Sequence, residues 1–414
     1  MTMIHRKVEI LSPAGSFDSL MAAIHAGADA IYFGVEQLNM RTRSSNSFVL
    51  EDLAKIGSLA RKHGIKAYIT LNTVMYEHDM QLLKSILQEV KTQGIDAVIA
   101  ADFAVMQYCK EMGIPLHVST QANVSNLESV QFFAQFADVV VLARELTLKQ
   151  VAQITKEIKR RKVTGPSGEL IKIEIFVHGA LCMAVSGKCY LSLHSQNAAA
   201  NRGACVQNCR RSYIVKDAET NEELLIDNEY IMSPQDLCTV DILDQVIEAG
   251  VDVLKIEGRS KGAEYVDTVT RCYREAKDAV LNNEYTAEKK AAWLDRLRKV
   301  YNRGFWEGYY LGRKLGEWTT EPGSKAEEKK IYVGKGTNYF PKIQIGEFLV
   351  ESGSIAKGDT ILVLGPELGM AKETMERLVV NGVEADQAAK GDKITFPIAT
   401  KISAKDKLYK LVKA

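Results

Sequence analysis

The sequence shows no marked excess of charge of either sign and no apolar run long enough to cross a bilayer. Lys and Arg total 53 against 52 Asp and Glu, so any contact with nucleic acid must come from local basic patches. The opening residues, MTMIHRKVEILSPAG, lack the apolar core and small-residue cleavage site of a signal peptide. These absences predict a cytoplasmic protein that does not enter a membrane.

Three common catalytic or cofactor motifs are also missing. The sequence contains no HExxH zinc motif and no GxSxG nucleophile elbow, and no glycine-rich dinucleotide fingerprint follows its first apolar run. The best-known routes to metalloprotease, serine hydrolase and dinucleotide chemistry are therefore not indicated, and any enzymatic activity has to depend on other residues.

Cysteine is scarce, with seven in 414 residues, yet four of the seven fall between Cys182 and Cys209. Cys182 and Cys189 flank a glycine-containing turn, and Cys205 and Cys209 follow in a loop rich in Asn, Ala and Gly. In a reducing compartment such clusters indicate metal ligands or catalytic groups before disulfides. Four thiolates suit tetrahedral zinc or a [4Fe–4S] cluster, and the lack of CxxC pairs favours iron and sulfide. Unrelated buried thiols are the alternative, and Cys238 is either a helix residue or a substitute ligand.

Short, wholly apolar runs alternate with helical patterns along the first two thirds of the chain. Such runs are typical of parallel strands that are buried on both faces, and several of the helical patterns end at Gly, the usual residue after a helix. Eight alternations predict an α/β fold, a (β/α)8 TIM-like barrel, with a doubly wound open sheet as the alternative. The expected strands are 8–15, 27–34, 66–72, 94–102, 115–121, 136–144, 171–179 and 250–259.

The expected domain organisation follows from the same patterns. Residues 1–313 form the barrel domain, which is interrupted after the seventh strand by a cysteine-rich insertion at 180–249. This insertion leaves the carboxyl end of a strand, the face at which barrel enzymes hold their chemistry. Residues 314–328 read as a linker, and the short alternating runs of 329–414 predict a small antiparallel β-barrel.

Polar residues at the ends of the predicted strands are candidates for substrate contacts. A forked pair of arginines in the loop LNMRTRSSNSF would suit a dicarboxylate, although each such residue could equally form a salt bridge at the rim of the barrel. The candidates are Arg41, Arg43, Asn46, Gln121, Asn123, Arg144, Lys255 and Arg259.

Two residues are candidates for proton transfer. His178 lies four residues before Cys182 and could serve as an acid–base group, because an unperturbed histidine titrates near neutrality. It could also merely form a hydrogen bond with a loop carbonyl. Glu257 ends the eighth predicted strand and is the second candidate.

The stretch EIFVHGALCMAVSGKCYLS (174–192), followed by NRGACVQNCRR (201–211), resembles the signature of the collagenase-like peptidases of unknown catalytic type. Within that family it is most similar to the branch of the tRNA hydroxylation proteins P. The segments EILSPAG, GADAIYFG, HVSTQANVSN and LKIEGR also look like family landmarks, so the resemblance extends over most of the chain. The C-terminal region is similar to the second domain of elongation factor Tu.

The resemblance implies a [4Fe–4S] cluster held by Cys182, Cys189, Cys205 and Cys209. It also implies tRNA as partner, prephenate as co-substrate, and oxygen-independent hydroxylation of the wobble uridine to 5-hydroxyuridine. Related branches act on ribosomal RNA or on ubiquinone and share the cysteines. One ubiquinone-branch member takes its fourth ligand from elsewhere, which keeps Cys238 open as a ligand here.

Two other functions stay open at this point. The older family name implies a peptidase, for which Cys182 and His178 could form a dyad if the thiolate were not bound to a cluster. A zinc-stabilised RNA-binding or assembly protein without catalysis is the other. We expect an enzyme of RNA modification, and the sequence leaves open whether a protein partner is needed.

Overall fold

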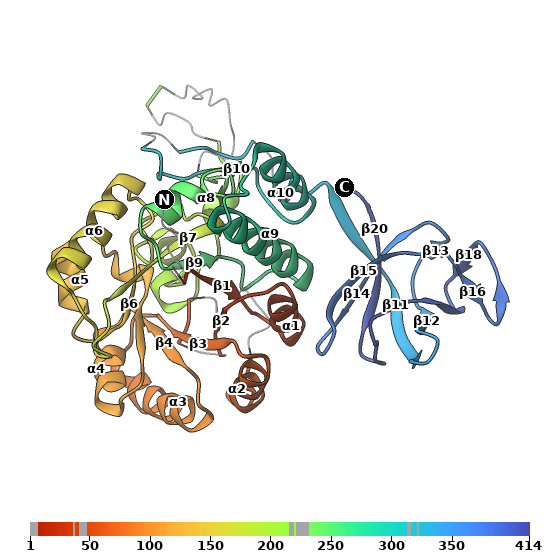
Figure 1. Cartoon of the computed structure of the whole chain (residues 1–414), viewed down its shortest axis with the longest axis horizontal. Helices are drawn as coiled ribbons and strands as arrows, with labels where there is room; N and C mark the ends of the chain where they lie inside the picture. Colours follow the sequence, from red (N-terminus) through yellow and green to blue (C-terminus); the bar gives the residue numbers. More distant parts are fainter. Residues whose placement is uncertain are drawn as a thin grey trace.

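The computed structural model describes residues 7–35, 38–40, 48–214, 219–220, 232–312, 316–320 and 323–414. A ring of parallel strands is surrounded by helices, and an antiparallel sheet stands to one side of it, reached through the long strand β11 (Glu328–Phe340) (Figure 1). No helix within the described residues is long and apolar enough to cross a membrane.

The predicted (β/α)8 barrel is confirmed. Strand β9 pairs in parallel with both β7 and β1, which closes the ring, and each of the other barrel strands pairs with its neighbours in chain order. The barrel strands are β1 (Glu9–Pro13), β2 (Ala30–Phe33), β3 (Lys66–Leu71), β4 (Ala97–Ala100), β5 (Leu116–Val118), β6 (Val139–Val141), β7 (Lys172–Gly179) and β9 (Val253–Ile256).

Helices follow the strands and cover the outside of the ring (Figure 1). Gly64 and Gly94 adopt left-handed backbone conformations directly after α2 and α3, as the sequence predicts for helix ends. The helices of the barrel domain are α1 (Phe17–His25), α2 (Asp52–His63), α3 (Met80–Gln93), α4 (Phe103–Met112), α5 (Leu127–Phe133), α6 (Leu148–Arg161), α8 (Leu243–Glu248), α9 (Ala263–Leu281) and α10 (Ala287–Lys299).

The aspartate that recurs before the strands has a common structural role. Asp29 accepts a hydrogen bond from the amide of Ile10, an oxygen of Asp96 lies 2.8 Å from the amide of Ala67, and Asp252 bonds the amide of Ile173. In each case the carboxylate satisfies a backbone donor at the start of the neighbouring strand. The sequence repeat therefore reflects how adjacent strands are joined at the amino end of the barrel.

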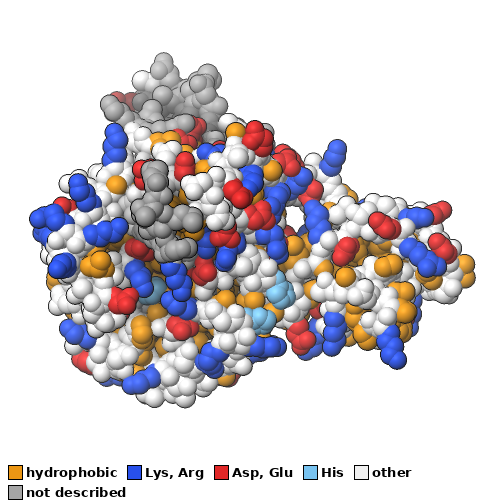
Figure 2. All heavy atoms as spheres, viewed as in Figure 1, with side chains coloured by type: hydrophobic (Ala, Val, Ile, Leu, Met, Phe, Trp, Pro, Cys, Tyr) orange, Lys and Arg blue, Asp and Glu red, His pale blue; other side chains and the backbone are white. Residues whose placement is uncertain are grey.

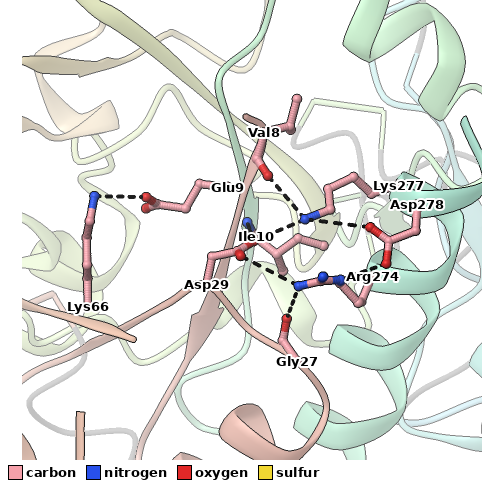
Figure 3. Close-up of polar contacts among 9 residues, drawn as sticks. All are labelled: Val8, Glu9, Ile10, Gly27, Asp29, Lys66, Arg274, Lys277 and Asp278. Carbon is pink, nitrogen blue, oxygen red and sulfur yellow. Dashed lines mark hydrogen bonds and ion pairs between the residues drawn. The ribbon is translucent and has the colours of Figure 1, made fainter. Parts of the chain in front are cut away.

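The carboxylate of Asp29 also fixes the longest helix to this end of the barrel (Figure 3). Its oxygens lie 3.2 Å from Nζ of Lys277 and 3.6 Å from Nη1 of Arg274, both on α9. Lys277 also donates to the carbonyl of Val8, and Arg274 donates to that of Gly27. One helix thus contacts the beginnings of the first two strands, which strengthens the closure of the ring.

A buried ion pair lies inside the barrel. Glu174 on β7 and Lys255 on β9 are almost fully excluded from solvent, and Nζ lies 2.5 Å from the carboxylate. Burial opposes ionisation of the carboxyl group, but the charges of Lys255 and His117 hold the pKa of Glu174 below its usual range. Lys255 is therefore committed to an internal contact below the carboxyl end of the barrel.

The insertion after β7 returns to the sheet through the short strand β8 (Asp236–Cys238), which runs antiparallel to β7 with Cys238 opposite His178. Strand β10 (Phe305–Trp306), which follows α10 in the chain, pairs with β8. Between β7 and β8 the cysteine-bearing chain forms α7 (Leu191–Gln196) and the single turns Ala200–Arg202 and Asn208–Arg210.

The C-terminal domain is antiparallel, as predicted. Its main sheet has the order β15-β14-β20-β11-β12-β19-β16-β17, and β13 pairs with β18. Phe348 and Phe396 stack at the centre of its apolar core. The strands after β11 are β12 (Ile345–Val350), β13 (Ser354–Ala356), β14 (Thr360–Gly365), β15 (Gly369–Thr374), β16 (Val379–Val380), β17 (Val383–Glu384), β18 (Gln387–Ala389), β19 (Lys393–Pro397) and β20 (Lys407–Lys413).

The two domains touch through α1 and the β14–β15 hairpin. Gly369 has a positive φ of 72°, and a Cβ there would lie 2.7 Å from the backbone nitrogen of Ala22. Nδ1 of His25 lies 3.1 Å from the carbonyl of Leu368, and Lys330 pairs with Glu264 on α9 at 2.6 Å. The close backbone approach and the ion pair fix the C-terminal domain against the barrel.

Candidate functional site

The four clustered cysteines line one cavity of about 430 Å³. The cavity lies where β7 passes into the insertion, and it also touches Glu257 just after β9. Both points are carboxyl ends of barrel strands, where this fold places its chemistry. The structure therefore brings Cys182, Cys189, Cys205 and Cys209, all from the insertion after β7, to one cavity.

The four cysteines supply a donor set of thiols for a metal centre. Among the described residues, no three His, Cys, Asp or Glu side chains converge closely enough to hold one metal ion. Thiolates around tetrahedral zinc lie about 2.3 Å from the metal and hence within about 4 Å of one another. A [4Fe–4S] cluster distributes its cysteine ligands over separate iron atoms and requires a wider opening. The residues present thus fit such a cluster.

Electrostatics confirm that the four thiols share one environment. Burial raises the pKa of Cys209, the positive charge of Arg210 opposes this rise, and Cys182, Cys205 and Cys189 each raise the pKa further. The adjacent cation partly offsets the mutual repulsion of the thiolates. A bound cationic centre would remove the remaining penalty, because metal binding deprotonates thiols.

Arg210 holds the two ends of the insertion together. Its guanidinium donates to the carbonyl of Leu181 at 2.5 Å, to that of Pro234 at 2.7 Å and to the hydroxyl of Ser233 at 3.0 Å. Leu181 precedes the first of the four cysteines, and Ser233 and Pro234 lie just before β8. A single side chain next to Cys209 therefore fixes the entry and the exit of the loop.

The cysteine-bearing loop is also anchored to the loop after β3. The amide of Val74 donates to the carbonyl of Asn201, and Arg202 forms a bidentate contact with buried Asp79, at 2.5 and 3.1 Å. The same guanidinium lies over the ring of Tyr76, 4.3 Å from its centroid. Since Ala200 lines the cavity, these contacts hold one of its walls in place.

Among the described residues, four cations and one carboxylate line the cavity. The cations are Arg144, Arg210, Lys261 and Arg303, and the carboxylate is Glu257. Such a wall attracts an anion, such as a negatively charged cluster or an organic acid.

Arg144 is the cation that offers an unused donor. Its Nη1 bonds the carbonyl of Ala180 at 3.0 Å, and the guanidinium stacks on Phe176, 3.8 Å from the ring centroid. Its Nε is buried and has no hydrogen-bond partner among the described residues. Because buried donors are rarely left unpaired, this nitrogen indicates where a ligand atom would bind.

The two residues expected to transfer protons are placed differently. Glu257 lines the cavity. Its backbone packs closely against Gly179, because a Cβ on Gly179 would lie 2.6 Å from the carbonyl oxygen of Glu257. His178 does not line the cavity. It packs instead among the rings of Tyr265, Tyr273 and Phe305, on the side facing α9.

A local irregularity explains the position of His178. The pairing between β7 and β9 shifts by one residue between Phe176 and His178, so that His178 lies opposite Ile256 rather than facing the barrel interior. Burial lowers the pKa of His178 to about 3, so the ring stays neutral. The structure thus provides no Cys182–His178 dyad, and it does not support the acid–base role for His178.

Cys238 is likewise turned away from the cavity. Cys238 is on β8, opposite His178 on β7. The hydroxyl of Tyr273 donates to its sulfur at 3.9 Å. Burial raises the pKa of its thiol to about 12. The structure does not bring Cys238 to the other four cysteines, so the role of substitute ligand is not supported.

The candidate substrate contacts separate into three groups. Gln121 and Arg144 line the cavity, and Gln121 is held by Nδ2 of Asn72 at 3.1 Å. Asn123, Lys255 and Arg259 are not among the residues lining it. Arg41, Arg43 and Asn46 lie outside the described residues.

Arg259 and Asn123 have structural contacts close to the mouth. Nη1 of Arg259 lies 2.6 Å from Oγ1 of Thr70 and 3.2 Å from Oδ1 of Asn39. A Cβ on Gly34 would come within 2.7 Å of that nitrogen, so a side chain there would displace the guanidinium of Arg259. Nδ2 of Asn123 donates to the carbonyls of Gln121 and Ser186, which joins β5 to the cysteine-bearing loop.

Sequence reasoning missed three cavity residues, Lys261, Tyr301 and Arg303. Nζ of Lys261 lies 3.0 Å from the centroid of the Tyr301 ring, and Arg303 pairs with buried Asp236 at 3.3 Å. Tyr301 and Arg303 come after α10, about a hundred residues beyond the cysteines, and no local pattern marks them. The position of Lys261, just after LKIEGR, was the one available signal.

Comparison with known proteins gives the following relatives. The sequence model of Peptidase family U32 matches residues 15–320. A protein named Collagenase from Porphyromonas gingivalis is 51% identical over 98% of each chain. The tRNA hydroxylation protein P1 of Bacillus subtilis is 32% identical over 91% of this chain and 88% of its own. The 23S rRNA 5-hydroxycytidine C2501 synthase of Escherichia coli is 32% identical over 76% of this chain and 47% of its own length.

Proposed function

Since this chain belongs to Peptidase family U32, whose named members include RNA hydroxylation proteins, we propose that it hydroxylates a pyrimidine base of RNA. The favoured substrate is the wobble uridine of tRNA, which becomes 5-hydroxyuridine without molecular oxygen. The observation that carries the proposal is the single cationic cavity lined by all four clustered cysteines at the carboxyl end of the barrel.

Cys182, Cys189, Cys205 and Cys209 would hold a [4Fe–4S] cluster. Such a cluster supplies one-electron chemistry at a potential set by its surroundings. The protein contributes the surroundings: the charge of Arg210 beside Cys209 and the loop that Arg210 closes through the carbonyl of Leu181. The four cysteines include no CxxC pair of the kind usual in structural zinc sites, which favours a cluster over zinc.

Prephenate is the proposed co-substrate, and the cationic wall suits a dicarboxylate. Arg144 has an unpaired buried Nε, and Arg303 and Lys261 face the same cavity. Two carboxylates could therefore be oriented by forked guanidinium contacts. Glu257, the one carboxylate lining the cavity, lies where it could hold a proton during the reaction.

A peptidase is the second candidate, because the relative that is 51% identical carries the name Collagenase. The geometry gives this function little support. Cys182 lines the cavity while His178 faces α9, so a nucleophile and its base are not brought together.

The test is to delete the gene in its own organism and to analyse nucleosides of total tRNA by mass spectrometry. Loss of 5-hydroxyuridine derivatives, restored by the wild-type gene and by Cys272→Ser but not by Cys189→Ser, supports the proposal. Cys272 is buried on α9 and serves as the matched cysteine control. Unchanged nucleosides together with gelatin hydrolysis by the purified protein would favour the peptidase instead.

A further inference from the structure

The segment that carries the four cysteines has an unusual charge composition. Residues 180–214, here called the cysteine segment, contain four Lys and Arg and no Asp or Glu, although Asp and Glu make up 52 of the 414 residues. By contrast, the face of the molecule in Figure 2 mixes acidic and basic side chains. Because the stretch carries cations and no carboxylate of its own, its side chains are suited to contact with a polyanion.

Three side chains of this segment lie immediately outside the cavity. Lys188 and Tyr190 flank Cys189, and Arg211 follows Arg210; in each case the neighbouring residue lines the cavity. All three are exposed, and Tyr190 retains 76% of its accessible surface. Within the described part of the chain, neither Lys188 nor Arg211 forms an ion pair. Their charges and the ring are therefore exposed to solvent next to residues that line the cavity.

A second exposed ring is joined to the same segment. Tyr76 is 48% exposed and stacks with Arg202, which belongs to the cysteine segment. Because Arg202 is fixed by Asp79, the position of this ring is set relative to the cavity. Exposed aromatic rings together with Lys and Arg are the usual composition of a site for single-stranded nucleic acid, where bases stack and phosphates pair with the cations.

We propose that the outer surface of the cysteine segment binds a single-stranded stretch of RNA. Tyr190 and Tyr76 stack on bases, and Lys188 and Arg211 contact phosphates. This inference rests on the proposed function, since an enzyme that modifies a base must hold it unpaired above its reactive centre. It adds the residues that would hold the strand on either side of the target base.

The test measures binding of a fluorescein-labelled oligouridylate of about ten nucleotides, a length within the usual range of single-strand sites. The full-length protein, purified without oxygen, is titrated and followed by fluorescence anisotropy. Tyr190→Ala weakens binding about tenfold, as expected for one lost stacking contact, while Tyr190→Phe keeps wild-type affinity. Iron and sulfide content, measured for each variant, shows that the cysteines are undisturbed.

Charge reversal tests the phosphate contacts. The double variant Lys188→Glu, Arg211→Glu reduces affinity and lowers the slope of log affinity against log salt by about 1.4, the value for two contacts to a single strand. Lys62→Glu, at the exposed end of α2, is the matched control and leaves both quantities unchanged. Equal affinity and slope in all these proteins, or no saturable binding by the wild type, would overturn the proposal. So would a denatured collagen chain that competes with the oligouridylate at equal concentration.

The experiments distinguish a failure of the RNA-binding surface from a failure of the proposed function. Binding through Tyr190 without any 5-hydroxyuridine in cells would keep the surface and reject uridine hydroxylation. Normal 5-hydroxyuridine levels in cells that carry Tyr190→Ala with the double charge reversal would reject the surface and keep the function.

Discussion

The guanidinium of Arg210, the residue after the last of the four clustered cysteines, donates to the carbonyl of Leu181, the residue before the first. The contact closes a loop of twenty-eight residues around the cavity. A lysine could not reproduce it, because Arg210 uses a forked set of donors to reach Leu181, Pro234 and Ser233 together.

Replacement of Arg210 should therefore reduce the affinity of the cysteines for metal. We expect Arg210→Lys to lower cluster retention about 10- to 100-fold, as is usual when a group that orients ligands is lost. Iron retained per chain after dialysis against a graded chelator measures the effect. The neighbouring Arg211→Lys, on an exposed residue, should behave as wild type; equal iron retention in Arg210→Lys and Arg211→Lys would show that the forked contacts of Arg210 do not hold the site.

Gly179 should be intolerant of a side chain. Its φ is 103°, and a Cβ would lie 2.6 Å from the carbonyl of Glu257, so Gly179→Ala combines backbone strain with a backbone clash. We expect a loss of about 3 kcal/mol or more in unfolding free energy. Gly64→Ala has a similar positive φ but open space around it and should cost about 1 to 2 kcal/mol. Urea unfolding compares the two, and equal losses would contradict the crowding.

The buried pair of Lys255 and Glu174 should show strong coupling. Lys255→Met leaves an uncompensated carboxylate inside the barrel and should cost about 3 to 5 kcal/mol. The double variant Lys255→Met, Glu174→Leu removes both charges and should recover most of that loss. A double-mutant cycle in urea provides the measurement, and additive effects of the two changes would show that the pair is not coupled.

His178 should make the protein sensitive to acid. Burial lowers its pKa to about 3, below the ordinary value of 6.5, so the unfolded chain binds a proton that the folded chain does not. Stability from this group is fully present above pH 6.5 and is lost as pH falls towards 3, by about 1.4 kcal/mol per pH unit. The imidazole ring of His178 packs against the rings of Tyr265, Tyr273 and Phe305. The negative charge of Glu257 opposes the lowering of the pKa of His178.

The measurement is the urea midpoint between pH 6.5 and 5. His178→Gln should decline less steeply than wild type, whereas His194→Gln, on an exposed residue, should follow the wild type. All three proteins keep the four cysteines, so any effect of acid on a bound cluster is common to them. Parallel curves for His178→Gln and wild type would mean that the ring binds a proton as readily in the folded chain as in the unfolded chain.

Periodicity predicted the barrel because each strand and helix carries its own local pattern. The runs beginning with Asp29, Asp96 and Asp252 marked strands correctly, although the aspartate accepts a hydrogen bond from an amide of the preceding barrel strand, a partner that no local pattern identifies. The clustering of the cysteines was likewise visible, since all four belong to one loop.

What the sequence could not show depends on register and on long-range contacts. Strict alternation along β7 would turn His178 to the barrel interior with Phe176, and the one-residue shift in pairing reverses this. Lys261, Tyr301 and Arg303 reach the cavity only through the packing of the segments after β9 and α10. A single sequence carries no signal for a β-bulge, or for cavity residues that come from segments far along the chain.

The most direct test is the metal content of the full-length protein purified without oxygen. The account predicts a brown protein with about four iron atoms and four sulfides per chain, abolished by serine at Cys182, Cys189, Cys205 or Cys209 and retained with serine at Cys238. A colourless protein that carries one zinc ion and no sulfide, or iron that is lost equally in Cys238→Ser, would contradict it.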